Sequence, residues 1–301
     1  MTMRPVLIAG PTASGKSAMA LSIARSTGGM VINADSQQVY RDWRVLTARP
    51  SLEEEAQAPH RLYGHIALDQ EYSVGHWLRE IAPILAQGTE RPIIVGGTGL
   101  YFKALTEGLA PIPAVPPDIR AEGEAQMARL GTKAFADAFA ARDPQTAAMI
   151  DMINPRRVLR AWEALEATGE GLAAWTARTP APLVPLSACT AIALTPARDW
   201  LYARCEARFD AMLKAGALDE VEAVMALNLP ETAPGLRALG APELTDYLCG
   251  LLTLEEAKVK AKTETRRYAK RQMTWIRNQM AAWSRLDPAA SDATEKALAM
   301  V

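Results

Sequence analysis

Cysteine is scarce in this sequence of 301 residues, which contains only Cys189, Cys205 and Cys249. The three lie far apart, no two form a C-x-x-C pair, and their number is odd. These features argue against a disulfide framework and against a zinc site. A reducing cytoplasm is the environment that fits such a sequence best.

Histidine is equally scarce, and none of the three histidines has metal-ligand spacing with a cysteine or a carboxylate. We therefore expect structural rather than catalytic roles for His60, His65 and His76.

Long apolar runs are absent too. No stretch of 18 residues is free of charged or strongly polar side chains, and residues 1–9 lack the apolar core of a signal peptide. Neither membrane insertion nor export is therefore expected. The content of hydrophobic residues, 49%, is still high enough to bury a full core in one large domain or two unequal ones.

An excess of positive charge is also missing, because 33 Lys and Arg face 34 Asp and Glu, with a net charge of -1 and a pI near 6.4. Any polyanionic partner must therefore be held by a local basic patch.

Short, fully apolar runs predict strands of a parallel sheet that is buried on both faces. They are residues 6–9, 30–32, 93–95 and 191–194. The first is followed by glycines and then by a helical pattern over 18–24. The predicted fold is α/β, a P-loop NTPase-like parallel sheet with flanking helices. Because ligands bind beyond the carboxyl ends of such strands, Lys16, Asp35 and Thr98 should meet at one site.

Proline-rich stretches before residue 118 and after residue 179 enclose an Ala-, Arg- and Glu-rich segment with helical spacing. We expect a helical insertion domain over 116–179 within a discontinuous core made of 1–115 and 180–301. Further helices are expected over 197–227, broken near Gly216. Residues 253–283 read as one helix of about 45 Å.

One motif carries a strong chemical signal, since it matches G-x-x-x-x-G-K-[ST] and lies between a strand and a helix. Its residues are Gly10, Pro11, Thr12, Ala13, Ser14, Gly15, Lys16 and Ser17. Backbone N–H groups and the helix N-terminus would hold phosphate, while Lys16 supplies a charge and Ser17 a Mg²⁺ ligand. The motif predicts a bound di- or triphosphate. It leaves kinases, NTPases and pyrophosphate-releasing transferases open.

Asp35 follows the second strand and places a carboxylate near the phosphate loop, where it could take a proton or bind Mg²⁺. By itself the residue is equally consistent with a cap of the next turn. The glycine-rich stretch 96–101 is ambiguous for the same reason, because such turns after strands are common.

The segment 258–285 is the local basic patch, with nine basic residues, the single acidic residue Glu264, and the aromatics Tyr268, Trp275 and Trp283. An amphipathic helix whose aromatics pack on the core would give the same pattern. Arg156, Arg157 and Arg160 strengthen the alternative of a nucleic-acid surface.

Seven stretches, in this order along nearly the whole chain, resemble the tRNA dimethylallyltransferase family of isopentenyltransferases. They are GPTASGKS at 10–17, DSQQVYR at 35–41, TARP at 47–50, GGTGLY at 96–101, RRVLRAWEALEATG at 156–169, RFDAMLKAGALDEV at 208–221 and TRRYAKRQMTWIR at 265–277. Two stretches depart from the family pattern, Gly240-Ala241-Pro242-Glu243 where Gly-Tyr-Lys-Glu is frequent and Asn154-Pro155-Arg156-Arg157 where Asp-Pro-Gln-Arg is usual.

The resemblance implies transfer of a dimethylallyl group from dimethylallyl pyrophosphate to the adenine 3′ of the anticodon. In this view the phosphate loop holds pyrophosphate rather than ATP, and Mg²⁺ is the cofactor. Asp35 is implied as the general base, Thr98 as a contact to the reacting centre, and Lys16 with Arg208 as partners of the leaving group.

The resemblance also implies contacts with the anticodon stem-loop of tRNA. The implied residues are Asp35, Ser36, Gln37, Gln38, Thr98, Arg120, Arg156, Arg157, Val158, Leu159 and Arg160, joined by Arg267, Lys270 and Arg271 of the basic segment. Nothing in the sequence demands more than a monomer. A P-loop small-molecule kinase and an RNA-binding protein that uses the loop as a nucleotide switch remain alternatives.

Overall fold

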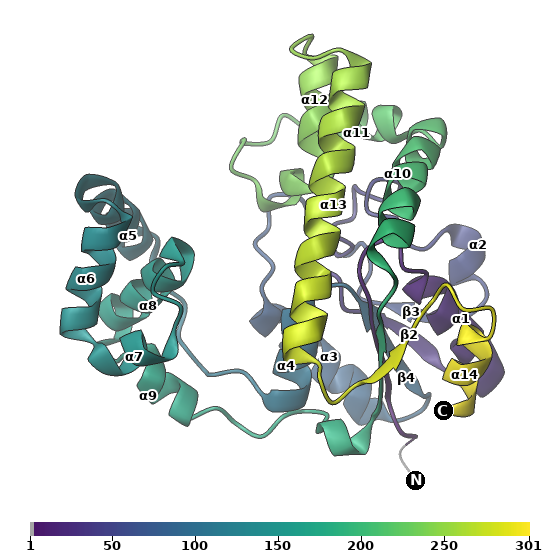
Figure 1. Ribbon diagram of the computed structural model, residues 1–301, viewed down its shortest axis with the longest axis horizontal. Coiled ribbons are helices and arrows are strands. Elements are labelled where there is room, and N and C mark those ends of the chain that lie inside the picture. Colours follow the sequence, from purple (N-terminus) through teal and green to yellow (C-terminus); the bar gives the residue numbers. More distant parts are fainter. Residues whose placement is uncertain (1–2) are drawn as a thin grey trace. The chain divides into compact units, whose positions relative to one another are not determined.

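The structure is a computed structural model that describes residues 3–301 (Figure 1). The chain divides into two compact units. The first combines the residues up to Thr106 with Leu183–Val301, and the second is Glu107–Pro182. The proline-rich stretches had suggested 116 and 179 as the limits of the inserted unit, so it begins earlier and ends later than the composition indicates.

The first unit is built on a sheet of six strands, all parallel, in the order β3-β2-β4-β1-β5-β6. The strands are β1 (Val6–Ala9), β2 (Met30–Asn33), β3 (His60–Arg61), β4 (Pro92–Gly96), β5 (Thr190–Leu194) and β6 (Ser284–Leu286). The four predicted strands are present. β3 and β6 were not predicted, because each is too short to show an apolar run.

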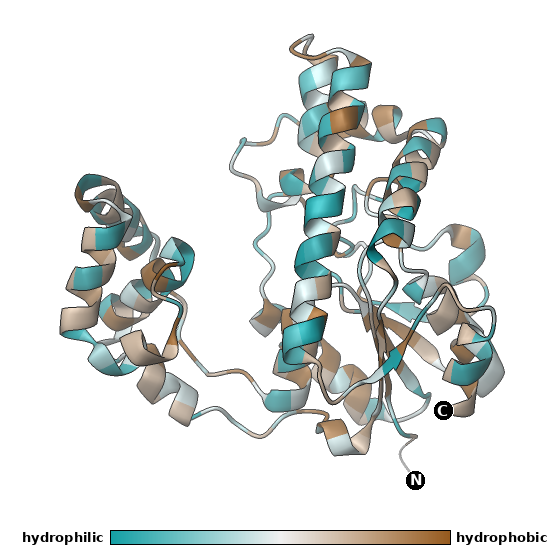
Figure 2. Ribbon diagram, in the orientation of Figure 1, coloured by the Kyte–Doolittle hydropathy of each residue, from teal (hydrophilic) through white to brown (hydrophobic). Residues whose placement is uncertain are grey.

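Helices cover both faces of this sheet, and the side chains of the strands alternate between them. Val6 and Ile8 of β1 pack with α1 and α14, whereas Leu7 and Ala9 pack with α3 and α4. Figure 2 shows the resulting apolar centre. The helices of these two layers are α1 (Lys16–Thr27), α3 (Val74–Gln87), α4 (Gly99–Glu107) and α14 (Ala293–Ala299).

A further layer of helices lies beyond the carboxyl ends of the strands and forms its own apolar cluster with the loop after β2. Val39, Trp43 and Leu46 of that loop pack with Phe209 and Val221. The helices are α10 (Arg198–Lys214), α11 (Ala217–Met225), α12 (Ala241–Leu248) and α13 (Leu254–Gln279), and two short elements, α2 (Leu52–Glu55) and η2 (Pro234–Arg237), belong to the loops of this unit. A further short element, η1 (Leu186–Ala188), directly precedes β5. The break predicted near Gly216 is confirmed, because this glycine has a φ of 95° between α10 and α11.

The longest helix, α13, is shorter than the sequence predicts. A capping box of Thr253 and Glu256 fixes its start, but it ends at Gln279 rather than at residue 283. Trp283 then turns back toward Met280, and the chain enters β6. The single helix over 253–283 was therefore wrong at its carboxyl end, since an edge strand of three residues gives no periodic signal.

The second unit consists of five helices with a small core of Phe135, Phe139, Val158 and Trp162. The helices are α5 (Pro117–Leu130), α6 (Thr132–Arg142), α7 (Pro144–Met149), α8 (Pro155–Thr168) and α9 (Leu172–Ala177). None of the helices formed by residues 3–301 is long and apolar enough to cross a membrane.

Candidate active site

The phosphate-binding loop connects the end of β1 to the start of α1. Ala13 and Gly15 both have positive φ angles, 63° and 85°, so the loop coils tightly and points its N–H groups inward. Gly15 caps α1 without any side-chain bond. The free N-terminus of the helix therefore supplies positive potential to the space in front of the loop.

Lys16 is buried at the start of α1, and its ammonium donates to the carbonyl of Pro11 at 3.3 Å. Burial lowers the pKa of Lys16 from 10.5 to about 8, while the negative charge of Asp35 opposes this shift. A buried cation with one carbonyl partner favours a bound anion. Ser17, the next residue, is partly exposed on the same turn.

Asp35 lies directly beyond the end of β2, where it is buried. The backbone N–H of Asp35 donates to Asn33 Oδ1 at 2.8 Å, and its Oδ1 accepts from the N–H of Gln37 at 3.0 Å. These bonds hold a tight turn after the strand. The carboxylate therefore has a fixed position, as a group that receives a proton in a reaction requires.

Thr98 follows β4 and is tied to the same turn. Its hydroxyl accepts from the N–H of Ser36 at 2.9 Å and donates to Ser36 Oγ at 3.2 Å. Between the two strands, Gly96 passes so close to Ala34 that a Cβ on it would lie 2.0 Å from the Ala34 carbonyl oxygen. The contact requires glycine, and it brings Thr98 beside Asp35.

Arg208 reaches the phosphate loop from α10. Its guanidinium donates to the hydroxyl of Thr12, and burial lowers its pKa. Arg204, one turn earlier, donates to the carbonyl of Ala13 at 2.9 Å. Two guanidinium groups thus contact a loop that already contains Lys16. This concentration of positive charge is typical of a site for a multiply charged anion.

A cavity of about 370 Å³ lies in front of these residues. Its wall combines most of the phosphate loop between Thr12 and Ser17 with Asp35, Arg208 and Tyr268, and also has an apolar part. The apolar side chains are those of Leu46, Phe209, Met212 and Leu239. Thr98 and its hydrogen-bond partner Ser36 are both outside this wall.

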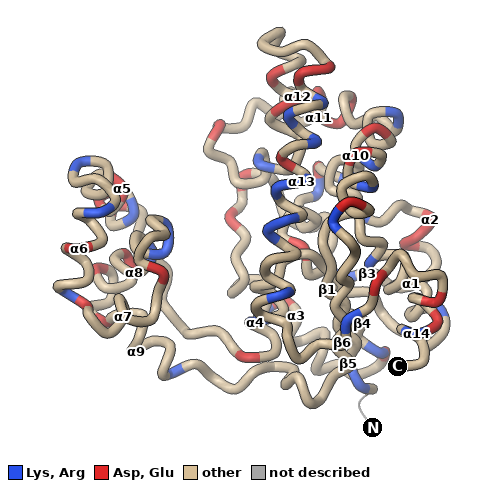
Figure 3. The backbone as a smooth tube through the Cα atoms, in the orientation of Figure 1, with Lys and Arg blue, Asp and Glu red and all other residues tan. Residues whose placement is uncertain are grey.

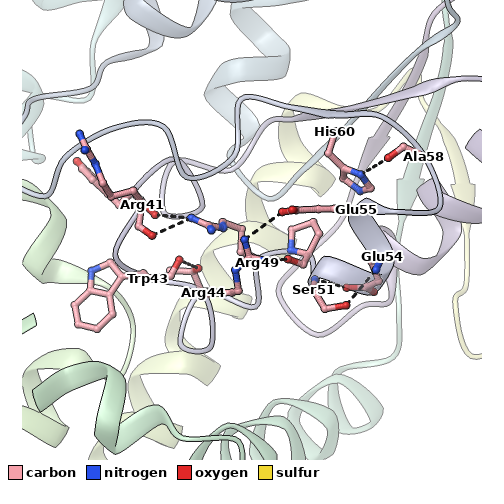
Figure 4. Close-up of polar contacts among 12 residues, drawn as sticks. Arg41, Trp43, Arg44, Arg49, Ser51, Glu54, Glu55, Ala58 and His60 are labelled. Carbon is pink, nitrogen blue, oxygen red and sulfur yellow. Dashed lines mark hydrogen bonds and ion pairs between the residues drawn. The ribbon is translucent and has the colours of Figure 1, made fainter. Parts of the chain in front are cut away.

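The loop after Tyr40 closes one side of the cavity and is held by an internal polar network (Figure 4). Arg49 donates to the carbonyls of Tyr40 and Arg41. Arg44 pairs with Glu55 at 3.4 Å and donates to the carbonyl of Pro50.

From the opposite side, one carboxylate anchors this loop. Glu220 of α11 accepts the backbone N–H groups of Arg44, Val45 and Leu46. The position of Leu46 in the cavity wall therefore depends on a residue that does not itself line the cavity.

Some of the predicted site residues lie in the first unit, at the cavity, and others lie in the second unit. The structure brings Lys16, Ser17, Asp35 and Arg208 together at one cavity, with Gln37 and Gln38 beside them. Ser36 and Gln37 also line a second hollow with Arg237 and two tyrosines.

The predicted RNA contacts on the insertion belong to the second unit. Arg120 lies on α5, and α8 begins at Pro155, where Asn154 caps it through the N–H groups of Arg156 and Arg157. Asn154, which stands where the family usually has Asp, thus still caps the helix. Val158 is only 1% exposed and packs in the core of the unit, so the structure gives it no surface with which to contact RNA.

Most of the basic segment 258–285 belongs to α13, and Figure 3 shows its Lys and Arg residues along that helix. Arg267, Lys270 and Arg271 are exposed, although Arg267 pairs with Glu264 at 2.5 Å and Arg271 lies over the ring of Tyr268. The larger aromatics do not share this surface, because Trp275 and Trp283 pack against the core of the sheet. The packing of the aromatics on the core is thus confirmed, whereas contact of the exposed cations with RNA stays a prediction.

The predicted structural roles of the histidines agree with their contacts. His76 belongs to the capping box of α3, His65 contacts Glu80, and His60 contacts the carbonyl of Ala58. Within residues 3–301, no group of three His, Cys, Asp or Glu side chains is arranged to hold a metal ion.

Four residues around the cavity received no role from the sequence. Arg204 has the spacing of one helical turn from Arg208, which is a signal that would have found it. Arg49, Tyr268 and Gln272 lie within stretches that support the family resemblance, but only the structure shows what they contact.

The comparisons with known proteins agree with this geometry. The sequence profile of the family described as IPP transferase matches residues 38–279, and that described as isopentenyl transferase matches 3–70. A tRNA dimethylallyltransferase of Cereibacter sphaeroides is 56% identical over 280 residues, which is 93% of this chain and 88% of that protein. One of a Ruegeria species is 53% identical over 287 residues, 95% of this chain and 96% of that protein.

Solved structures give the same result. The tRNA isopentenylpyrophosphate transferase of Bacillus halodurans has a TM-score of 0.70 at 33% identity, covering 98% of this chain and 94% of that one. A eukaryotic dimethylallyltransferase acting on tRNA has a TM-score of 0.84 at 25% identity, covering 99% of this chain and 78% of that one. With a profile match over most of its length and relatives that are more than half identical, this chain belongs to the IPP transferase family.

Proposed function

We propose that this chain transfers a dimethylallyl group from dimethylallyl pyrophosphate to the exocyclic amine of the adenine 3′ of the anticodon in tRNA. The products are N6-isopentenyladenosine and pyrophosphate. The observation that carries the proposal is that a glycine-rich phosphate loop, a partly buried arginine and a buried carboxylate face one cavity. The names of the curated relatives support the same reaction.

The phosphate loop would hold the leaving group. As the allylic C–O bond breaks, the electron pair departs with the diphosphate, and negative charge grows on its bridging oxygen. The ammonium of Lys16 and the guanidinium of Arg208, which both contact the phosphate loop, would stabilise that charge. The apolar side chains in the wall fit a hydrocarbon donor better than a sugar.

Asp35 would act as the general base. The lone pair of an adenine amine is delocalised into the ring, so the amine is a weak nucleophile. Removal of its proton while the new C–N bond forms contributes about 10²–10⁴-fold to the rate. The fixed turn of Asp35 suits this role. Thr98 would act beside it through Ser36.

Mg²⁺ is the proposed cofactor. The hydroxyl of Ser17 at the start of α1 fits a cation that prefers oxygen ligands and takes most of them from phosphates and water. When bound, the ion would neutralise charge on the diphosphate.

The RNA substrate would be held outside the cavity. The target base must leave the stack of the anticodon loop, at a cost of a few kcal/mol. Ser36, Gln37 and Gln38, which line the two cavities, would contact the base as it enters. Exposed cations of α8 and α13 would contact the phosphates of the stem-loop. We further propose that the enzyme works in the cytoplasm as a monomer.

Two labelled substrates test the proposal against a small-molecule kinase, which would share the loop and the sheet. The protein is incubated with tRNA and either dimethylallyl pyrophosphate labelled in the allyl group or ATP labelled in the γ-phosphate. We expect label in the tRNA from the allylic donor alone. Phosphoryl transfer from ATP without any transfer from the allylic donor would reject the proposal.

A further inference from the structure

The side chain of Gln272 connects two loops that carry opposite halves of the candidate site. Its Oε1 accepts the backbone N–H of Thr12 in the phosphate loop at 2.8 Å. Its Nε2 donates to the carbonyl of Gly97, beside Thr98, at 3.0 Å. One amide group thus joins the loop after β1 to the loop after β4.

Gln272 is buried, with an exposed fraction of 5%. A polar side chain at such a depth is costly unless its groups are bonded, and here both ends of the amide are. Apolar packing alone would be served better by leucine or methionine at this position. The position therefore selects for the two hydrogen bonds rather than for volume.

The amide of Gln272 occupies the space that a side chain at residue 97 would otherwise fill. A Cβ on Gly97 would lie 2.1 Å from Nε2 of Gln272 and 3.1 Å from Oδ2 of Asp35. The absence of a side chain at residue 97 thus makes room for the amide next to the carboxylate. Burial, and after it the negative charge of Asp35, raises the pKa of the Tyr268 hydroxyl, which belongs to the same helix.

The helix that carries Gln272 is the basic helix α13. Lys270 and Arg271 are exposed on it, while Gln272 and Ile276 point into the protein. The surface proposed for tRNA and the connection between the two loops are therefore parts of one rigid element.

We propose that Gln272 is a positioning residue that holds the phosphate loop and the Gly97–Thr98 loop at the separation needed for transfer. This inference rests on the proposed function, because it assigns the leaving group to the first loop and the incoming amine to Asp35, which the second loop contacts through Thr98 and Ser36. Gln272 itself touches neither reacting atom. Its contribution should appear in kcat, because a misplacement of about 1 Å costs as much as about 10²-fold in rate.

The first test is Gln272→Met, which keeps the length of the side chain but removes both hydrogen bonds. The matched control is Gln279→Met on the same helix, whose amide makes an exposed bond to Lys103 at 3.1 Å. We expect kcat of Gln272→Met to fall about 100-fold. The KM values for dimethylallyl pyrophosphate and tRNA should change by less than about threefold, since the groups that bind them remain. The control should retain the wild-type kcat.

Rates are measured well below the thermal unfolding midpoint of each variant, so that loss of folded protein does not lower kcat. A kcat for folded Gln272→Met within about twofold of wild type would overturn the inference. So would a rise of the donor KM that accounts for the whole loss. If the wild-type protein transfers no allyl group, the proposed function fails instead, and the two failures are thus distinguished.

A second test covers the case in which Gln272→Met does not fold. Gly97→Ala disturbs the same hydrogen bond from the other loop, and Gln272→Ala creates the space that the added methyl group needs. In a double-mutant cycle we expect the two losses in kcat to overlap, so that the double variant is no slower than the slower single variant. Losses that multiply would contradict the inference.

Discussion

The guanidinium of Arg208 donates a hydrogen bond to the hydroxyl of Thr12, which joins α10 to the phosphate-binding loop. Because this partly buried cation lies beside the proposed site of the leaving group, its removal should affect the transition state most. We expect Arg208→Gln to lower kcat about 10²–10³-fold. Steady-state rates with labelled dimethylallyl pyrophosphate measure the effect. Arg198→Gln, at the exposed start of the same helix, should keep the wild-type rate, and an equal loss in both variants would contradict the assignment.

Asp35→Asn tests the proposed base with little change of shape. The amide oxygen can still accept the N–H of Gln37, so the turn after β2 should persist. We expect kcat to fall about 10²–10⁴-fold, because asparagine cannot take the proton of the amine. Binding of tRNA, measured by filter retention, should stay within about threefold of wild type. Asp69→Asn, at an exposed position, serves as the control. A wild-type rate for Asp35→Asn would remove Asp35 as the base.

Lys16 should make the stability of the free protein depend on pH. Its pKa is lowered from 10.5 to about 8, chiefly by burial. Between these values the unfolded chain holds a proton that the folded protein has lost, so this group makes stability rise with pH across that window. Below pH 8, the buried charge costs roughly 3 kcal/mol.

Lys16→Met should therefore raise the free energy of unfolding near neutral pH, with a gain that shrinks toward pH 10.5. Urea titrations of both proteins at several pH values measure the gain. The same variant should lose donor binding. Lys296→Met on α14 has an exposed side chain and should show neither effect. A gain that stays constant with pH would show that the charge of Lys16 is not its source.

Glu220 should stabilise the loop that carries Leu46. Its carboxylate accepts three backbone N–H groups, from Arg44, Val45 and Leu46. We expect Glu220→Ala to reduce the free energy of unfolding by about 1.5–3 kcal/mol and to raise hydrogen exchange in this loop. Glu222→Ala, exposed on the same helix, should change stability by less than about 0.5 kcal/mol. Unchanged exchange in the loop of Glu220→Ala would refute the anchoring role.

Lys270 and Arg271 should contribute to tRNA affinity through phosphate contacts. Replacing both by glutamine should weaken binding and lower the slope of log affinity against log salt by about 0.7 for each lost contact. Filter binding over a range of salt concentrations gives the slope. Lys296→Gln is the control, because Lys296 lies on α14 and pairs with Asp292. A slope equal to that of wild type would exclude the exposed face of α13 from the interface.

Much of the fold was visible in the sequence because the central strands are apolar on both faces. Residues 6–9 and 191–194, for example, pack between two layers of helices, and such strands show as uninterrupted hydrophobic runs. The edge strand β6 has only one buried residue of three, Leu286, and its position is set by pairing with β5. Pairing of this kind leaves no local pattern.

The part of the candidate site that lies at the ends of the strands could also be predicted from the sequence. Lys16, Asp35 and Thr98 follow strand ends, and the topology of a parallel sheet brings such positions together. Gln272 and Glu220 act over 260 and more than 170 residues of sequence, through single hydrogen bonds to backbone groups. A contact to a backbone N–H leaves no mark on the sequence of its partner, so no motif could have shown it.

The approach of Gly96 to Ala34 has a consequence for variation at this position. A single methyl group on residue 96 would have to push apart the backbones of β2 and β4 at their carboxyl ends, next to Asp35 and Thr98. Saturation mutagenesis of residue 96 should thus return glycine alone, even under selection for folding without catalysis. The single hydrogen atom that glycine has in place of a side chain thus sets the distance between the ends of β2 and β4.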